Sequence, residues 1–139
     1  MKNIIFKSAI FTAILSFTLI SCGKYEEGPK LSLRSKKARV SGDWTLEQYL
    51  INGNDSTQAY LSWVGANFMM KIEKDGSYSV VTAFGTATGT WELGEDKDDL
   101  LLTVSGSTDS YRILKLKNKE MWLKHTDSNG VVEESHLVQ

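Results

Sequence analysis

The chain has 139 residues, a formal net charge of −1 and a single cysteine. One thiol excludes an internal disulfide framework, which needs an even number of cysteines. Residues 40–139 carry eight basic against fifteen acidic side chains, a net charge of −7, and this acidity argues against a nucleic-acid interface.

The N-terminal segment has the pattern of a secretory signal peptide. Lys2 and Lys7 supply two positive charges, and residues 8–20 are almost wholly apolar. That run is shorter than the ~20 apolar residues that a membrane-spanning helix needs. It is typical of the apolar region of a signal peptide, which we predict over residues 1–21.

The end of this run, Leu19-Ile20-Ser21-Cys22, resembles the lipobox of bacterial lipoproteins. The resemblance implies that Cys22 is acylated with fatty chains such as palmitate, becomes the first residue after cleavage, and anchors the chain in an outer membrane. Two or more acyl chains suffice for stable anchoring, since each buried methylene contributes about 0.8 kcal/mol. Glu26 and Glu27 weakly resemble an export signal, so the periplasmic and surface-exposed faces both stay open. The alternative is a buried cysteine in an ordinary N-terminal helix.

Residues 22–39 have the composition of a flexible tether. Gly28-Pro29 forbids regular structure locally, and apolar residues are sparse. Residues 24–39 carry six basic against two acidic side chains, a net charge of +4. This surplus either serves solubility or lies against anionic lipid headgroups while the acidic domain is pushed outward.

From residue 40 to residue 139 the pattern alternates strands and turns, which indicates one small domain of about 100 residues. Asn52-Gly53-Asn54-Asp55 and Lys74-Asp75-Gly76 are strong turn signals. The longer connection over residues 56–66 could form a helical turn. We predict eight short strands, near residues 44–50, 67–74, 77–84, 88–93, 100–104, 110–117, 121–126 and 131–138.

Alternation along the strands predicts which side chains share a face. Near the start of the domain, one face would hold Trp44, Leu46 and Leu50, and the other Thr45, Glu47 and Tyr49. Three later strands would each present one apolar face, formed by Phe68, Met70 and Ile72, by Tyr78, Val80, Thr82 and Phe84, and by Gly89, Trp91 and Leu93.

Sequential antiparallel strands without crossover helices form a meander. An open meander exposes two edges, and closure into a barrel removes both of them. Eight strands is the number at which a barrel is either filled by side chains or holds one small ligand. We therefore predict an all-β fold, an eight-stranded antiparallel up-and-down barrel over residues 40–139, with a two-sheet sandwich as the alternative.

Gly42-Asp43-Trp44, at the head of the first of these strands, resembles the signature of the lipocalin family. The turns named above and the later Gly89-Thr90-Trp91 are similar to those of lipocalin-like lipoproteins of Bacteroidetes-type bacteria. The resemblance implies that Trp44 plugs the closed end of the barrel and that Gly42 permits entry into the strand. It also implies a basic side chain stacked on Trp44, a role that would fall to Arg112 or Lys124.

Inward aromatic and thioether side chains are the candidate ligand-binding residues, because they suit an apolar ligand in a concave site. One of them, Trp63, would act as a lid in the long connection. The alternative is that these residues simply fill a small barrel. The candidates are Trp44, Trp63, Phe68, Met70, Tyr78 and Trp91.

Catalytic residues are not predicted. His125 and His136, the only histidines, lie in no nucleophile or zinc pattern, and residues 95–99 lack the spacing of a calcium loop. We expect no cofactor, no metal, a monomer, and a non-catalytic protein that binds a small apolar ligand. The alternative function is a module that contacts protein or glycan through its outer face or loops.

Overall fold

The computed structural model describes residues 34–139, so the predicted signal peptide, Cys22 and most of the predicted tether lie outside the described residues. Neither helix within residues 34–139 is long and apolar enough to span a membrane. The elements of this part are α1 (Lys36–Val40), β1 (Gly42–Ile51), β2 (Asn54–Asp55), α2 (Thr57–Val64), β3 (Met69–Ile72), β4 (Ser77–Thr82), β5 (Gly85–Leu93), β6 (Asp99–Val104), β7 (Ser107–Leu116), β8 (Glu120–Thr126) and β9 (Val132–Val138).

Eight of the strands form a closed antiparallel barrel, which confirms the predicted fold. The order along the sheet is β1-β3-β4-β5-β6-β7-β8-β9, and β9 pairs back onto β1. The two-residue β2 pairs only with β1 and lies outside the ring. The connection predicted to allow a helical turn forms α2. β1 and β3 are adjacent in the ring, although α2 lies between them in the chain.

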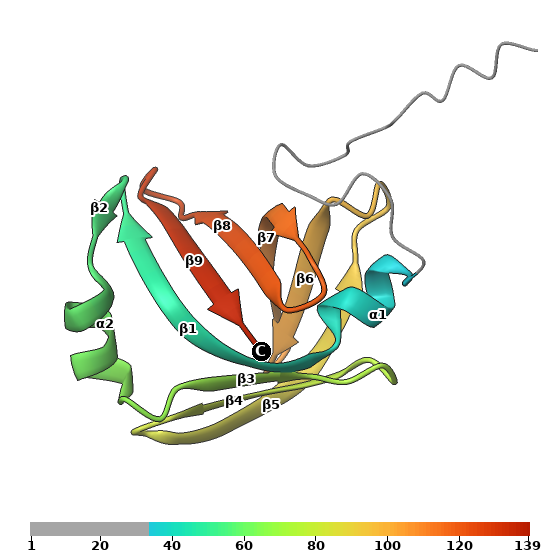
Figure 1. Ribbon diagram of the computed structural model, residues 1–139, viewed down its shortest axis with the longest axis horizontal. Coiled ribbons are helices and arrows are strands. Elements are labelled where there is room, and N and C mark those ends of the chain that lie inside the picture. The colour runs from blue at the N-terminus through green and yellow to red at the C-terminus, as the bar shows by residue number, and fades with distance from the viewer. Residues whose placement is uncertain (1–33) are drawn as a thin grey trace, which may run out of the picture.

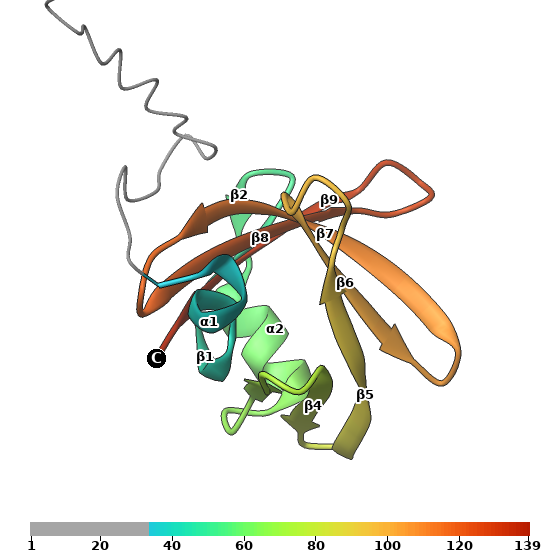
Figure 2. The ribbon, with the colours of Figure 1, turned by 90° about the vertical axis from the view of Figure 1, so that its right-hand side faces the viewer.

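The two helices lie at opposite ends of the barrel, as Figure 1 shows from the side. Figure 2 looks from the α1 end, with α1 in front, α2 behind it and the strands curving around both. We name the α1 end the closed end and the α2 end the mouth. The described chain begins at Arg34 beside α1, at the closed end.

The closed end is sealed by α1 and by fully buried apolar side chains. The indole N–H of Trp44 donates to the Val40 carbonyl at 2.7 Å, and this hydrogen bond links α1 to β1 at the closed end. Arg39 is 8% exposed, and its guanidinium donates to the Leu116 carbonyl at 2.8 Å. The residues with no exposed surface are Val40, Trp44, Leu100, Leu116, Met121 and Leu137. Residues 36–39, predicted as tether, thus form most of a helix that belongs to the folded domain.

Gly42 opens β1 with φ +150°, a conformation that side-chain-bearing residues rarely adopt. A Cβ at this position would come within 2.1 Å of the end of the Gln139 side chain, which is flexible and could move. The backbone conformation is therefore the stronger reason for glycine here. It allows the chain to turn from α1 into the strand that carries Trp44.

A β-bulge makes the predicted alternation of β1 wrong in its second half. The register with β9 runs from Leu46↔Leu137 to Gln48↔His136, so Glu47 is an extra residue. A bulge of one residue sends every following side chain to the other face. Tyr49 consequently points inward and is 6% exposed, whereas Leu50 is only half-buried on the outer face.

The apolar faces predicted for the later strands are confirmed, except at Phe84. Phe68, Met70 and Ile72 are 8%, 8% and 1% exposed, as their inward placement requires. Phe84 is 72% exposed, contrary to prediction, because β4 ends at Thr82 and Phe84 lies in the turn to β5.

Neighbouring leucines on β6 test the inward and outward faces. Leu100 has no exposed surface, whereas Leu101 is half-buried on the outer face. We expect Leu100→Ala to lower the free energy of unfolding by about 2–5 kcal/mol, because it leaves a cavity in the core. Leu101→Ala, the matched control, should cost less than about half of that, as measured by urea denaturation. Equal losses would contradict the register of β6.

Candidate functional site

The structure separates the six predicted site residues. Trp44, Phe68, Met70, Tyr78 and Trp91 belong to the buried core of the barrel, whereas Trp63 on α2 is 66% exposed at the mouth. The indole N–H groups of Trp44 and Trp91 donate to the carbonyls of Val40 and Glu73 at 2.7 and 2.6 Å. These two tryptophans therefore hold backbone elements in place as well as filling the core.

The mouth has a pocket between α2, the end of β1 and the start of β9. Its volume is about 320 Å³, near the lower end of the usual range for small-molecule sites. Of the predicted residues only Trp63 lines it. We name it the mouth pocket, and its lining residues are Tyr49, Ile51, Ser56, Ala59, Tyr60, Trp63 and Glu133.

Aromatic rings form the walls of the mouth pocket. Tyr60 stacks on Tyr49 with ring centroids 4.0 Å apart and an interplanar angle of 25°. Trp63 approaches Tyr60 edge-on at 6.2 Å, and Phe84 approaches Trp63 at 5.8 Å. Offset and edge-to-face contacts are the favoured geometries for such rings. An aromatic series therefore runs from the barrel lining out to the exposed rim.

Glu133 supplies the carboxylate of the mouth pocket. It lies near the start of β9, opposite Ile51 on β1 and His125 on β8. The Tyr49 hydroxyl donates a hydrogen bond to it. One donor leaves the carboxylate free to accept further hydrogen bonds, because its two oxygens offer about four lone-pair sites.

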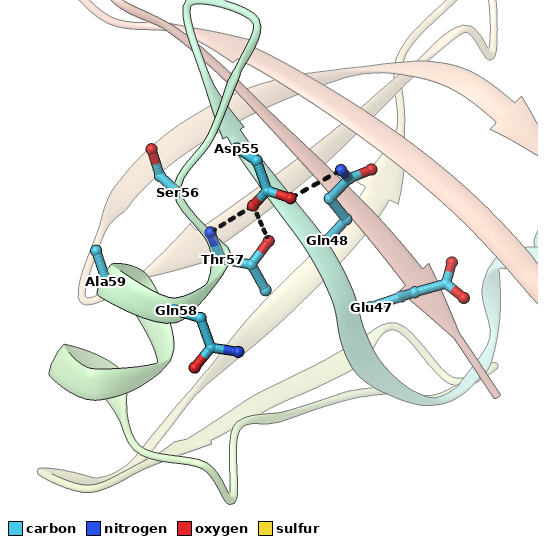
Figure 3. A pocket seen from close by; sticks show the side chains of 7 residues that line it. All are labelled: Glu47, Gln48, Asp55, Ser56, Thr57, Gln58 and Ala59. Carbon is cyan, nitrogen blue, oxygen red and sulfur yellow. Dashed lines mark hydrogen bonds between the residues drawn. The ribbon is translucent and has the colours of Figure 1, made fainter.

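A polar hollow lies on the outer side of α2, next to β1 (Figure 3). Hydrogen bonds within this hollow hold the helix against the strand. One oxygen of Asp55 accepts from the Thr57 backbone N–H at 2.9 Å and from its hydroxyl at 2.6 Å, and the other accepts from Gln48 at 3.2 Å. The Thr57 hydroxyl oxygen accepts in turn from the Tyr49 backbone N–H at 2.9 Å. This network places Tyr60, one turn further along α2, over Tyr49.

The polar hollow is larger than the mouth pocket, at about 730 Å³, but its chemistry is that of a structural contact. The Asp55 carboxylate accepts three hydrogen bonds from Thr57 and Gln48, and these bonds, led by the one from the Thr57 hydroxyl, lower the pKa of Asp55. A carboxylate satisfied in this way has little capacity left for a ligand. We therefore regard the mouth pocket as the candidate ligand site.

Burial keeps the tyrosines of the barrel protonated. It is the largest cause that raises the pKa of Tyr49, Tyr60 and Tyr78 above the ordinary value, and it raises the pKa of Tyr111 to about 12. The negative charge of Glu133 adds to the effect on three of them, Tyr49, Tyr60 and Tyr111. The hydroxyls therefore act as neutral hydrogen-bond donors at physiological pH.

The two histidines lie on opposite faces of the barrel wall. His125 packs on Tyr111 with centroids 5.1 Å apart, and its Nδ1 lies 3.0 Å from the Ser110 carbonyl, which can only accept. His136, on the outer face, stacks on Trp122 at 4.0 Å, and its Nε2 lies 2.6 Å from Glu134. Neither the Ser110 carbonyl nor the Glu134 carboxylate is a hydroxyl or thiol that a histidine could activate as a nucleophile.

Trp122 lies on the outer face between two side chains, a contact that the sequence did not predict. Its ring lies between His136 on β9 and Lys115 on β7, whose Nζ is 4.0 Å from the ring centroid. Lys115 also pairs with Glu120, which lowers the pKa of that carboxyl. The alternation of β8 would have placed Trp122 outside, but its partners come from two other strands and carry no local signal.

The aspartates at residues 96, 98 and 99, at the start of β6 and in the loop before it, form ion pairs with cations of the chain. Arg112 lies 3.4, 3.7 and 3.9 Å from Asp99, Asp96 and Asp98, and Lys36 lies 3.3 Å from Asp98. Within residues 34–139 no three His, Cys, Asp or Glu side chains are grouped as a metal site requires. The loop thus joins α1 to the barrel wall.

The expected stacking of Arg112 or Lys124 on Trp44 is wrong. Arg112 is turned toward the acidic loop, and Lys124 lies opposite it on the outer face, paired in register with Glu134. Trp44 is inside the barrel, so outward side chains do not reach it. The buried arginine at the closed end is Arg39, the last residue of the predicted tether.

No protein-family model matches the chain, and no curated protein is significantly similar to it.

The raised tyrosine pKa values predict that the fold is sensitive to alkali. Below about pH 10 the tyrosines are protonated in both states and their contribution is fully present. Above that pH the unfolded chain releases protons that the folded one retains, so stability falls by at most about 1.4 kcal/mol per pH unit for each tyrosine, and by less for the half-exposed ones.

The test is urea denaturation from neutral to alkaline pH, with tyrosinate absorbance followed in parallel. Tyr49→Phe is the matched variant and should show a shallower loss above about pH 10. Ionisation of all the tyrosines near pH 10, with unchanged stability, would contradict the burial of these hydroxyls.

Proposed function

We propose that the protein is a membrane-anchored, non-catalytic barrel that binds a small, largely apolar ligand at its mouth. The mouth pocket is the observation that carries this proposal. It joins an aromatic wall, the aliphatic side chains Ile51 and Ala59, and a few polar groups in a volume suited to a small molecule. The closed end, by contrast, is packed by α1 and Trp44.

The anchoring part of the proposal rests on the sequence around Cys22. A lipid on that thiol would hold the chain in an outer membrane through the segment that enters the domain beside α1. The mouth lies at the other end of the barrel (Figure 1). A ligand could therefore enter from the side away from the bilayer, and the short basic segment before α1 would face the lipid headgroups.

The proposal of a non-catalytic role is supported by the partners of the polar side chains. His136 is held by Glu134 and Trp122, and the aspartates before β6 are paired with Arg112 and Lys36. In the mouth pocket, Glu133 is the one acid, and the tyrosines around it are protonated. Binding of a small ligand needs only such fixed donors and acceptors.

A second candidate function is supported by the exposed aromatic rim. Trp63 and Phe84 are 66% and 72% exposed and lie 5.8 Å apart, although they come from α2 and from the β4–β5 turn. Adjacent exposed aromatic rings are typical of surfaces that contact protein or glycan. In that case the rim, and not the pocket behind it, would be the functional surface.

Mass spectrometry of the chain purified from a producing bacterium tests both parts of the proposal. Under denaturing conditions we expect a chain that begins at Cys22 and carries covalent acyl chains, and a Cys22→Ala variant that lacks them. Under native conditions we expect a non-covalent small molecule on both forms, since the residues that line the pocket all lie between Tyr49 and Glu133.

Each part can fail separately. A wild-type chain without acyl chains would contradict the anchoring, whatever it binds. A lipidated chain that never carries a small molecule, and whose Trp63→Ala form loses a protein or glycan partner, would replace the ligand-binding proposal by the second candidate.

A further inference from the structure

The mouth pocket combines aromatic faces with a carboxylate, and no lysine or arginine is among the described residues that line it. Its walls are the rings of Tyr49, Tyr60 and Trp63, and its acid is Glu133. The described lining of the pocket therefore offers a carboxylate without a lysine or arginine beside it.

Aromatic rings and a carboxylate attract the same chemical group. The face of a tyrosine or tryptophan ring is the negative end of its quadrupole and attracts a cation within about 6 Å of the centroid. A carboxylate accepts charge-assisted hydrogen bonds from an ammonium group. An anionic ligand, in contrast, would be repelled by Glu133 and would meet the negative faces of the rings.

The surroundings of Glu133 preserve its role as an acceptor. Glu133 accepts a hydrogen bond from the Tyr49 hydroxyl, which adds to burial in raising the pKa of that tyrosine, and a carboxylate with one such donor can accept further hydrogen bonds. His125, opposite Glu133 on β8, directs its Nδ1 to the Ser110 carbonyl at 3.0 Å. Asp109, on the inner face of β7 opposite Leu102, adds a second negative charge near this end of the barrel.

We propose that the mouth pocket recognises a small organic cation, with its ammonium group held by Glu133 and its apolar body against Tyr60 and Trp63. The inference rests on the proposed function, because it specifies the head group of the small ligand. The pocket volume of about 320 Å³ limits the ligand to a compact one, such as an arylalkyl ammonium. The net charge of −7 on residues 40–139 would favour the approach of such a cation.

The test is isothermal titration of the full chain at neutral pH with three probes of the same size. They are 2-phenylethylammonium, its neutral analogue 2-phenylethanol, and the anion phenylacetate. We expect the ammonium to bind at least about tenfold more tightly than the alcohol, the difference between a charge-assisted and a neutral hydrogen bond. The anion should show no binding.

Two neighbouring carboxylates provide a matched pair of variants. Glu133→Gln should abolish the preference for the ammonium, whereas Glu134→Gln, which removes the same charge from the outer face, should keep it. Trp63→Leu alters an exposed residue and should fold normally, as circular dichroism would verify. We expect it to weaken ammonium binding by about 2- to 5-fold through the lost cation–π contact.

The outcomes separate this inference from the function on which it rests. Equal binding of the ammonium and the alcohol, unchanged in Glu133→Gln, would overturn the cation inference and leave the small-ligand function standing. Binding of neither probe would also overturn the inference. The proposed function would then fail only if native mass spectrometry, too, found no small molecule on the chain.

Discussion

The antiparallel pairing of β1 with β9, from Thr45↔Val138 to Ile51↔Glu133, joins the two ends of the domain. Without it both strands would be open edges with unpaired backbone groups. The same pairing brings Tyr49 of β1 close to Glu133 of β9. The mouth pocket therefore exists only when the barrel is closed. The bulge at Glu47 is part of this seam, and it turns Tyr49 inward.

The closed barrel has two chemically different ends. At one end α1 brings Val40 over Trp44 and seals the core with apolar side chains and the buried Arg39. At the other end α2 adds Tyr60 and Trp63 and leaves a pocket. A barrel of eight strands has room for only one small ligand at most, so sealing one end restricts binding to the other. The proposed functions, ligand capture or contact through the rim, both use this mouth.

The sequence predicted the fold better than the site, for reasons that particular residues make plain. Period-two alternation and turn residues are local signals, and they identified all eight strands of the ring and the burial of Trp44. A bulge has no comparable signal, so the inward placement of Tyr49 was missed. The local sequence around Glu133 carries no signal of a site either, because the other lining residues of the pocket come from β1 and the α2 region. The helix α1 was not predicted, because its sequence is rich in basic residues and its stability comes from contacts such as that of Arg39 with the distant Leu116.

Amide hydrogen exchange, resolved by residue, measures the closure of the barrel directly. If β1 and β9 pair along their length, their ladder amides should exchange as slowly as those of the central strands β6 and β7, within about tenfold. The short β2, which pairs on one side only, provides an internal reference for an edge. Exchange of β1 and β9 at the rate of β2 would show an open sheet, in which Tyr49 and Glu133 are not held together and the mouth pocket does not exist.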